Sequence, residues 1–324
     1  MQDSFGRNIT YLRVSVTDRC DMRCFYCMGE TPTFRPRSEI LSLEELSALC
    51  SAFINLGVSK LRLTGGEPLI RRNVMLLIKD LSLHLNDGLL KELALTTNAS
   101  RLGEYALPLF EYGIRRINVS LDSLDSDKFT RITRNGDLKT VLKGIESAQK
   151  AGIKIKINTV ALKGINDDEF IKLAEWCAAC GFDLTFIEAM PIDGSQGQHL
   201  KHYLPLSDVR ALLSDNFALT PIANDTEGPA EFYINQANGQ KIGFIDPLSH
   251  NFCANCNRVR LTSAGSLYLC LGQEDKVELK EIIRQNRNPE ALTQAIALAV
   301  RNKPLGHNFA PGQLRSRTMS VTGG

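Results

Sequence analysis

Two sets of three cysteines are the first sign of chemistry in the sequence. They are Cys20, Cys24 and Cys27 near the start of the chain and Cys253, Cys256 and Cys270 near its end. Their spacings are C-x3-C-x2-C and C-x2-C-x13-C. A structural zinc site is closed by four nitrogen or sulfur ligands, so three thiolates leave one position for another residue. A cubane iron–sulfur cluster with three thiolates keeps one iron open for a non-protein ligand. The spacing alone leaves both interpretations open.

The histidines and the remaining cysteines bear on which metal each triplet could bind. His250 lies close to the second triplet and could complete a zinc site, whereas the first triplet has no histidine before His84. Cys177 and Cys180 also have C-x2-C spacing, but they fall inside a predicted helix (EWCAACG). A buried cysteine behaves as a small apolar residue, so we interpret these two as a packing pair.

The composition indicates a globular cytoplasmic protein. The chain has 324 residues, of which 43% are hydrophobic, and a formal net charge of +2. It has no apolar run of membrane-spanning length, and MQDSFGRNIT lacks the layout of a signal peptide. Nine cysteines in a large chain favour metal or redox chemistry over a disulfide framework. The near-neutral charge argues against a nucleic-acid partner.

Alternating strand and helix patterns must position the first triplet. The predicted strands are Tyr11–Val16, Lys60–Thr64, Glu92–Thr96, Arg115–Ser120, Ile153–Val160 and Leu184–Ile187. The predicted helices include one that starts at a Ser42/Glu45 capping box and ends at Gly57, and others over Val141–Ala151 and Asp167–Cys180. Six β/α units of this kind predict an α/β fold, a partial (β/α)6 TIM-like barrel whose strands are apolar on both faces.

The pattern changes after Met190. A polar stretch is followed by a predicted hairpin, in which Glu231–Gln236 and Lys241–Ile245 flank the turn signal Asn238-Gly239. We therefore expect a barrel domain over residues 1–194 and a smaller C-terminal unit over residues 195–324 that closes the barrel.

Basic residues inside the predicted strands suggest an anionic ligand. Arg13, Arg62, Lys154 and Lys156 are each flanked by apolar residues. Burying such cations without partners costs several kcal/mol each, roughly, so they need anions nearby. A nucleoside triphosphate inside the barrel would satisfy them together. Arg258 and Arg260 would point the same way if their segment is extended.

Three motifs carry a resemblance to a known family. The first triplet, with Tyr26 just before its last cysteine, resembles the signature of radical S-adenosylmethionine (SAM) enzymes, and Gly65-Gly66-Glu67-Pro68 resembles their methionine-binding turn. The stretch FCANCNRVRLTSAGSLYLC is similar to the auxiliary-cluster motif of the MoaA-type GTP 3′,8-cyclases of molybdenum cofactor biosynthesis. Nearly the whole chain is covered, down to the terminal Gly323-Gly324.

The resemblance implies cofactors and residue roles. It implies two [4Fe-4S] clusters, one on each triplet, the second carried by the C-terminal unit. SAM would be held by Tyr26, Gly66, Ser120 and Met190. GTP would be held by Arg13, Arg62, Thr96, Lys156, Arg258 and Arg260. The diglycine of Gly323 and Gly324 would enter the active site and assist the radical step, with Arg315 and Arg317 suited to an anionic pocket; a frayed terminus is the alternative.

The resemblance also implies the reaction. A 5′-deoxyadenosyl radical from SAM would take hydrogen from C3′ of the GTP ribose, and the carbon radical would attack guanine C8 to give (8S)-3′,8-cyclo-7,8-dihydroguanosine 5′-triphosphate. The implied partners are a flavodoxin- or ferredoxin-like electron donor and a downstream cyclic pyranopterin monophosphate synthase, and a homodimer is compatible with the resemblance. Two alternatives remain: a peptide-modifying radical SAM enzyme with auxiliary clusters, and a zinc module without enzymatic activity.

Overall fold

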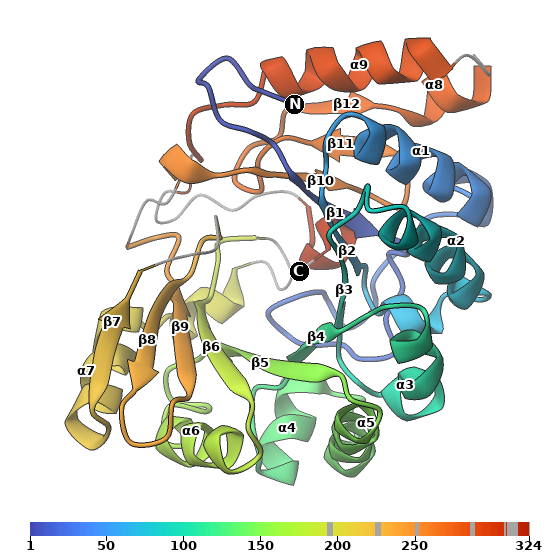
Figure 1. Ribbon diagram of the computed structural model, residues 1–324. Coiled ribbons are helices and arrows are strands. Elements are labelled where there is room, and N and C mark those ends of the chain that lie inside the picture. Colours follow the sequence, from blue (N-terminus) through green and yellow to red (C-terminus); the bar gives the residue numbers. More distant parts are fainter. Residues whose placement is uncertain are drawn as a thin grey trace.

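The computed structural model describes residues 1–192, 197–223, 228–249, 253–285, 289–307, 309 and 317–323. Its first two thirds alternate strands and helices. The strands are β1 (Tyr11–Ser15), β2 (Lys60–Thr64), β3 (Glu92–Thr97), β4 (Arg116–Ser120), β5 (Lys154–Ala161) and β6 (Asp183–Glu188). The helices are α1 (Leu43–Asn55), α2 (Val74–Asn86), α3 (Leu102–Glu111), α4 (Ser126–Thr133), α5 (Leu138–Lys150) and α6 (Phe170–Ala179). These helices lie on the outer side of a curved sheet (Figure 1).

Local sequence signals explain where several helices begin. Ser42 and Glu45 form the predicted capping box, in which each side chain accepts a hydrogen bond from the other residue's backbone N–H. Helix α5 begins three residues before the predicted start because the Asp137 carboxylate caps its first turn. Helix α6 begins at Phe170 rather than Asp167, since residues 163–169 form turns instead.

The C-terminal third extends the same sheet at both ends. Its elements are α7 (Leu206–Asn216), β7 (Leu219–Ile222), β8 (Glu231–Asn235), β9 (Lys241–Ile245), β10 (Arg258–Leu261), β11 (Ser266–Tyr268), β12 (Lys276–Glu278), α8 (Lys280–Gln285), α9 (Pro289–Arg301) and α10 (Met319–Thr322). The strand order in this 12-stranded sheet is β12-β11-β10-β1-β2-β3-β4-β5-β6-β9-β8-β7. The strands from β10 to β9 in this order are parallel, and the outer pairs are antiparallel. The predicted hairpin is present as β8 and β9.

The two faces of the sheet differ in chemistry, which corrects the expectation that both would be apolar. In β1, Leu12 and Val14 belong to the hydrophobic core shared with the helices, whereas Tyr11 and Arg13 line a cavity on the inner side. Side chains alternate between the faces of a strand, so each strand contributes to both. The inner face is polar because it surrounds this cavity rather than a packed core.

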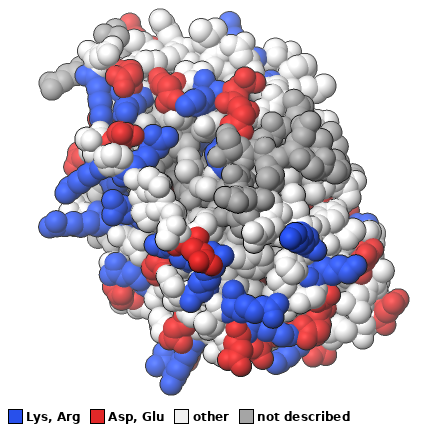
Figure 2. All heavy atoms as spheres, turned by 180° about the vertical axis from the view of Figure 1, so that it is seen from behind, with Lys and Arg blue, Asp and Glu red and all other residues white. Residues whose placement is uncertain are grey.

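The outer surface carries charges of both signs. On the face shown in Figure 2, blue basic and red acidic side chains lie beside one another. Among the residues that the structure describes, no helix is both long and apolar enough to span a membrane.

Candidate active site

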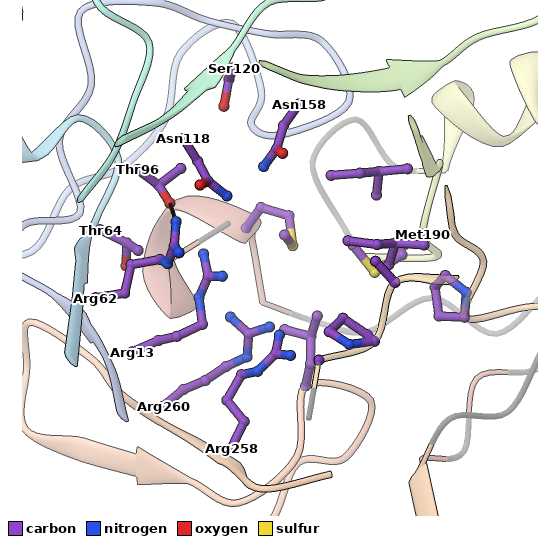
Figure 3. Close-up of a pocket in the computed structure, with 18 of the residues that line it drawn as sticks. Arg13, Arg62, Thr64, Thr96, Asn118, Ser120, Asn158, Met190, Arg258 and Arg260 are labelled. Carbon is purple, nitrogen blue, oxygen red and sulfur yellow. Dashed lines mark hydrogen bonds between the residues drawn. The ribbon is translucent and has the colours of Figure 1, made fainter. Parts of the chain in front are cut away.

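A cavity of about 740 Å³ lies inside the curved sheet. Its lining contains all six cysteines of the two triplets, all four residues expected to hold SAM and all six expected to hold GTP. Small-molecule sites have volumes of roughly 300–1,000 Å³, so the cavity has the size of a ligand site. Figure 3 shows side chains from several strands and from the C-terminal segment pointing into this one space. The structure therefore brings together residues that are far apart in the sequence.

The first triplet lies on the loop that follows β1. The backbone N–H groups of Cys27 and Met28 donate to the carbonyl oxygen of Cys24, which curls the loop into a tight turn. Burial raises the pKa of the Cys24 thiol well above its usual value and that of Cys27 to about 12, and the nearby Asp122 carboxylate acts in the same direction. The surroundings of these two cysteines therefore favour the neutral thiol over the thiolate when nothing is bound.

The Gly65-Gly66 turn, which follows β2, packs against the start of this loop through backbone hydrogen bonds. The N–H of Gly66 donates to the Thr17 carbonyl and the N–H of Glu67 donates to the Arg19 carbonyl, each at 2.8 Å. A Cβ on Gly66 would lie 2.2 Å from the Arg19 oxygen. Glycine at this position thus allows two backbone segments to touch immediately before Cys20.

The Glu67 side chain is a buried anchor of the same turn. Its carboxylate accepts hydrogen bonds from Leu69 N–H, Thr97 Oγ1 and Asn98 N–H. Burial nevertheless raises the pKa of Glu67 to about 7. The carboxylate thereby ties the turn after β2 to the end of β3.

A row of arginines crosses three neighbouring strands. The strand register places Arg13 of β1 beside Arg260 of β10 on one side and beside Arg62 of β2 on the other. Neighbouring strands are about 4.8 Å apart, and like charges directly opposite one another are destabilising. In Figure 3 these side chains and Arg258 point into the same space, and Arg62 also donates to Thr96 Oγ1 at 3.4 Å. This arrangement calls for a ligand with several negative charges.

The positive charges of the cavity lower the pKa values of both Tyr11 and Lys156. Burial would raise the pKa of Tyr11, but the charges of Arg62, Arg13, Arg258 and Lys60 outweigh it and lower the pKa to about 7. Burial, and then the charges of Arg62 and Arg116, lower the pKa of Lys156 to about 7. The Nε atom of Arg258 is buried without a hydrogen-bond partner. The inner face of the sheet is thus strongly positive in this region.

The second triplet is held by the N-terminal segment. The Arg7 guanidinium is buried, is paired with Asp3 at 2.6 Å, and donates to the carbonyl oxygens of Cys253, Pro304 and Leu305. The N–H of Cys256 donates to the Cys253 carbonyl. The first residues of the chain therefore fix the segment before β10 that carries Cys253 and Cys256.

The described part of the C-terminal tail is buried inside the barrel. Helix α10 contacts β1, and Ser320 and Thr322 are buried. The carbonyl of Gly323 accepts a hydrogen bond from Arg260 Nη1 at 2.8 Å, and the N–H of Ser320 donates to the Cys27 thiol. The tail thus lies between the first triplet and the arginine row.

Two of the predicted basic residues lie away from the anion site. Lys154 is exposed at the start of β5, so it is not among the cations of the cavity. Arg317 does not enter the anion site, because it pairs with Glu274 and packs over the Tyr268 ring. Cys177 lies in the hydrophobic core, as a packing residue should. His250, Arg315 and Gly324 lie outside the described residues.

Sequence reasoning missed three polar residues of the cavity. The Oδ1 atoms of Asn118 and Asn158 are buried without hydrogen-bond partners, and both side chains point into the cavity in Figure 3. Asp122 accepts a 2.6 Å hydrogen bond from the Tyr26 hydroxyl and another from Val160 N–H, and burial raises its pKa to about 6. For the two asparagines the available signal was an uncharged polar residue in an otherwise apolar strand, whereas Asp122 lies after the end of β4.

The cysteines fit iron–sulfur clusters by their chemistry. Each triplet offers three thiols that line the cavity, the first on one loop and the second on the segments before β10 and after β11. Three thiols are the donor set of a cluster with one open iron. No three His, Cys, Asp or Glu side chains in the described ranges lie close enough together to hold a single metal ion.

Comparison with known proteins identifies the family. Residues 14–177 match the family model of the Radical SAM superfamily, and residues 182–309 match the one described as Molybdenum Cofactor Synthesis C. The chain is 55% identical to a GTP 3′,8-cyclase of Paracoccus denitrificans over 99% of this chain and 95% of that protein. It is 52% identical to a GTP 3′,8-cyclase of Rhodopseudomonas palustris over 100% of this chain and 96% of that protein.

Solved structures agree on the fold. Streptococcus suis SuiB bound to S-adenosylmethionine has a TM-score of 0.61 at 15% identity, covering 92% of this chain and 68% of that one. The protein anSMEcpe with bound AdoMet has a TM-score of 0.58 at 16% identity, covering 86% and 82%. SAM and an iron–sulfur cluster are the cofactors of this superfamily. The chain belongs to the radical SAM superfamily and, within it, to the GTP 3′,8-cyclases.

Proposed function

We propose that this chain converts GTP into (8S)-3′,8-cyclo-7,8-dihydroguanosine 5′-triphosphate for molybdenum cofactor biosynthesis. The observation that carries the proposal is the row of Arg260, Arg13 and Arg62 across three strands of a cavity that the first cysteine triplet also lines. A triphosphate supplies the negative charge that this row needs, and its ribose would lie within the same cavity. The identity of 52–55% to GTP 3′,8-cyclases supports the same substrate.

The first triplet would hold the cluster that activates SAM. When bound, this cluster and SAM together supply a 5′-deoxyadenosyl radical at the expense of one electron. Tyr26, Gly66, Ser120 and Met190 surround the cavity beside this triplet and would hold SAM. The hydrogen bond from the Tyr26 hydroxyl to Asp122 fixes the tyrosine ring next to Cys27. The unpaired Oδ1 atoms of Asn118 and Asn158 would accept hydrogen bonds from ligand hydroxyl or amino groups.

GTP would lie between the arginine row and the second triplet. Arg13, Arg62, Arg258, Arg260, Lys156 and Thr96 would hold the triphosphate and the sugar. Guanidinium groups bind phosphate oxygens in pairs of charge-assisted hydrogen bonds. The guanine would reach the second cluster, which we assign to Cys253, Cys256 and Cys270. Holding C3′ and C8 of one nucleotide close together is the main contribution of the protein, along with exclusion of water.

The reaction also sets requirements on partners. The C3′–H bond breaks, a C3′–C8 bond forms, and one further electron and a proton complete the dihydro ring. A flavodoxin- or ferredoxin-like donor would deliver the electrons, and a cyclic pyranopterin monophosphate synthase would consume the product. We place this chemistry in the cytoplasm, where thiols stay reduced, and a homodimer is compatible with it.

Deuterium transfer tests the proposed reaction. The reconstituted enzyme is incubated without oxygen with SAM, a reductant and GTP deuterated at C3′. We expect deuterium in 5′-deoxyadenosine and a product isomeric with GTP. SAM cleavage without deuterium transfer, or transfer from an added peptide instead, would contradict the proposal.

Cysteine variants test the two cluster assignments. Cys24→Ala should abolish SAM cleavage, whereas Cys256→Ala should keep the first cluster and lose GTP turnover. Cys177→Ala is the matched control, because this buried cysteine lies in the core and away from the cavity lining; it should keep all the iron. Full cyclisation by either of the first two variants would refute the assignment.

A further inference from the structure

Lys303 is a buried cation without an assigned role. It follows α9 and is only 2% exposed to solvent. Lysine is almost never fully buried unless its charge is paired. The Nζ atom donates to the carbonyl oxygen of Leu269 at 2.5 Å, and no carboxylate in the described part of the chain forms an ion pair with it. One neutral carbonyl cannot balance a buried charge, so the site needs an anion.

The surroundings of Lys303 show where that anion would be. Leu269, whose carbonyl it contacts, immediately precedes Cys270. Lys303 lines the same cavity as Cys253, Cys256 and Cys270. Lys303 therefore contacts the backbone next to Cys270 and lies in the wall of the cavity that Cys253 and Cys256 also line.

The first triplet has the opposite surroundings. The Cys20 Sγ atom lies 3.7 Å from Asp21 Oδ1, and the Asp122 carboxylate accepts a hydrogen bond from the hydroxyl of Tyr26, which immediately precedes Cys27. At the second triplet, the Arg7 guanidinium donates to the Cys253 carbonyl, and the Lys303 ammonium donates to the Leu269 carbonyl next to Cys270. Fixed charges near an iron–sulfur cluster are one of the factors that set its reduction potential.

We infer that Lys303 is a positioning residue and the counter-cation of the second cluster, where it raises the cluster's reduction potential and holds the Cys270 loop through the Leu269 carbonyl. This inference rests on the proposed second cluster. Reduction adds negative charge to a cluster held by thiolates, and a buried cation stabilises that state most. The hydrogen bond to Leu269 fixes the backbone next to one of the three ligands.

A redox titration tests the inference. A variant with Cys20, Cys24 and Cys27 all changed to Ala isolates the second cluster, whose potential is followed by electron paramagnetic resonance in the absence of GTP. In this background, Lys303→Met should disfavour reduction about tenfold or more, a shift of about 59 mV or more to lower potential. Lys303→Arg should restore most of the potential. Arg301→Met, which removes an exposed cation from the same helix end, should leave it unchanged.

The outcomes separate this inference from the proposed function. If the triple-alanine protein holds no iron, the second cluster itself is absent and both fail. If it holds iron but Lys303→Met does not shift the potential, only the inference fails. Selective loss of GTP over guanosine binding, without a shift, would instead assign Lys303 to the triphosphate and also overturn it.

If Lys303→Met loses iron, the melting temperature of the cluster-free protein shows whether Lys303 acts as a counter-cation or as a structural support. A buried ammonium without its anion destabilises the fold, so methionine should raise the melting temperature of the cluster-free protein if the inference holds. Iron loss together with such a rise supports the inference. Iron loss with a lower melting temperature would show that Lys303 is a structural support and would overturn it.

Discussion

Buried arginine side chains in this cavity repel one another, and an anionic ligand would relieve this repulsion. Arg62 is only 4% exposed, and its guanidinium contacts Thr96 at 3.4 Å and the Tyr11 hydroxyl at 2.6 Å, whose pKa it helps to lower. Its neighbour in the strand register is Arg13. Repulsion between these charges is balanced when phosphate oxygens bind between them.

Arg62→Ala should therefore weaken GTP binding much more than guanosine binding. A charge-assisted contact of this kind is worth roughly 1.5–3 kcal/mol, which corresponds to a loss of affinity of about tenfold to a hundredfold. Calorimetry with both ligands measures the difference. Arg72→Ala removes an exposed arginine and should change neither affinity. Equal losses for the two ligands would show that Arg62 supports the fold rather than the phosphates.

Lys156 should take up a proton when GTP binds. Its pKa of about 7 means that it is mostly neutral at about pH 8, and Arg62, Arg116, Asp183 and Tyr11 are the groups that act on it besides burial. A triphosphate favours the charged ammonium, so binding raises this pKa again. At about pH 8 the triphosphate itself is fully ionised and releases no proton. Because binding takes up a proton, the affinity of GTP for the site should fall as the pH rises above 7.

Calorimetry in buffers of different ionisation enthalpy counts these protons. In Lys156→Met the uptake should be smaller by up to about one proton, and the remainder belongs to Tyr11. An unchanged uptake in this variant would show that Lys156 does not face the phosphates.

At the scale of elements, the turn between β2 and α2 works as a support for the loop between β1 and α1. The bonds from Gly66 and Glu67 to the carbonyls of Thr17 and Arg19 join the two segments just before Cys20. Sequence reasoning assigned Gly66 to contact with a ligand. The structure shows that the same glycine is also required for contact between two backbones.

Gly66→Ala should cost the protein its first cluster. The new Cβ would lie 2.2 Å from the Arg19 carbonyl oxygen, so the cysteine loop must shift. We expect the iron content to fall by about half and SAM cleavage to be lost, since the second triplet is untouched. Gly103→Ala, where the nearest atom is 3.7 Å away, is the control and should keep both. Full iron content in Gly66→Ala would contradict this account.

At the scale of the molecule, the sequence predicted the individual strands better than the order in which they pair. Periodicity and caps predicted the six strands from β1 to β6 to within about two residues at each end, because these signals are local. No local signal indicates that β10 pairs with β1 or that β9 pairs with β6. The cavity residues Asn118 and Asn158 were missed for the same reason, since their importance depends on the register of β4 and β5, which places Asn118 beside Lys156 and Asn158 beside Ser120.

The tail links the C-terminus to the centre of the molecule. Deleting Gly323 and Gly324 should leave both clusters, SAM binding and GTP affinity nearly unchanged but should strongly reduce formation of the cyclised nucleotide. Gly323→Ala should do similar harm, because its φ is +73° and a Cβ would lie 1.9 Å from Thr64 Oγ1. Gly88 has the same φ with no atom within 4 Å, so Gly88→Ala controls for backbone strain. Product formed at the full rate by the truncated enzyme would show the tail to be dispensable.

The pairing of β1 with β10 has a consequence for how the chain matures on the ribosome. The first strand to emerge has a partner, Arg258–Leu261, that is among the last strands to be made. Until then the apolar β1 has one open edge, and β6 has another until β9 appears. Open edges of this kind invite pairing with other chains. The nascent barrel therefore depends on the end of the chain for protection from aggregation, and a fragment of residues 1–194 would keep both edges exposed.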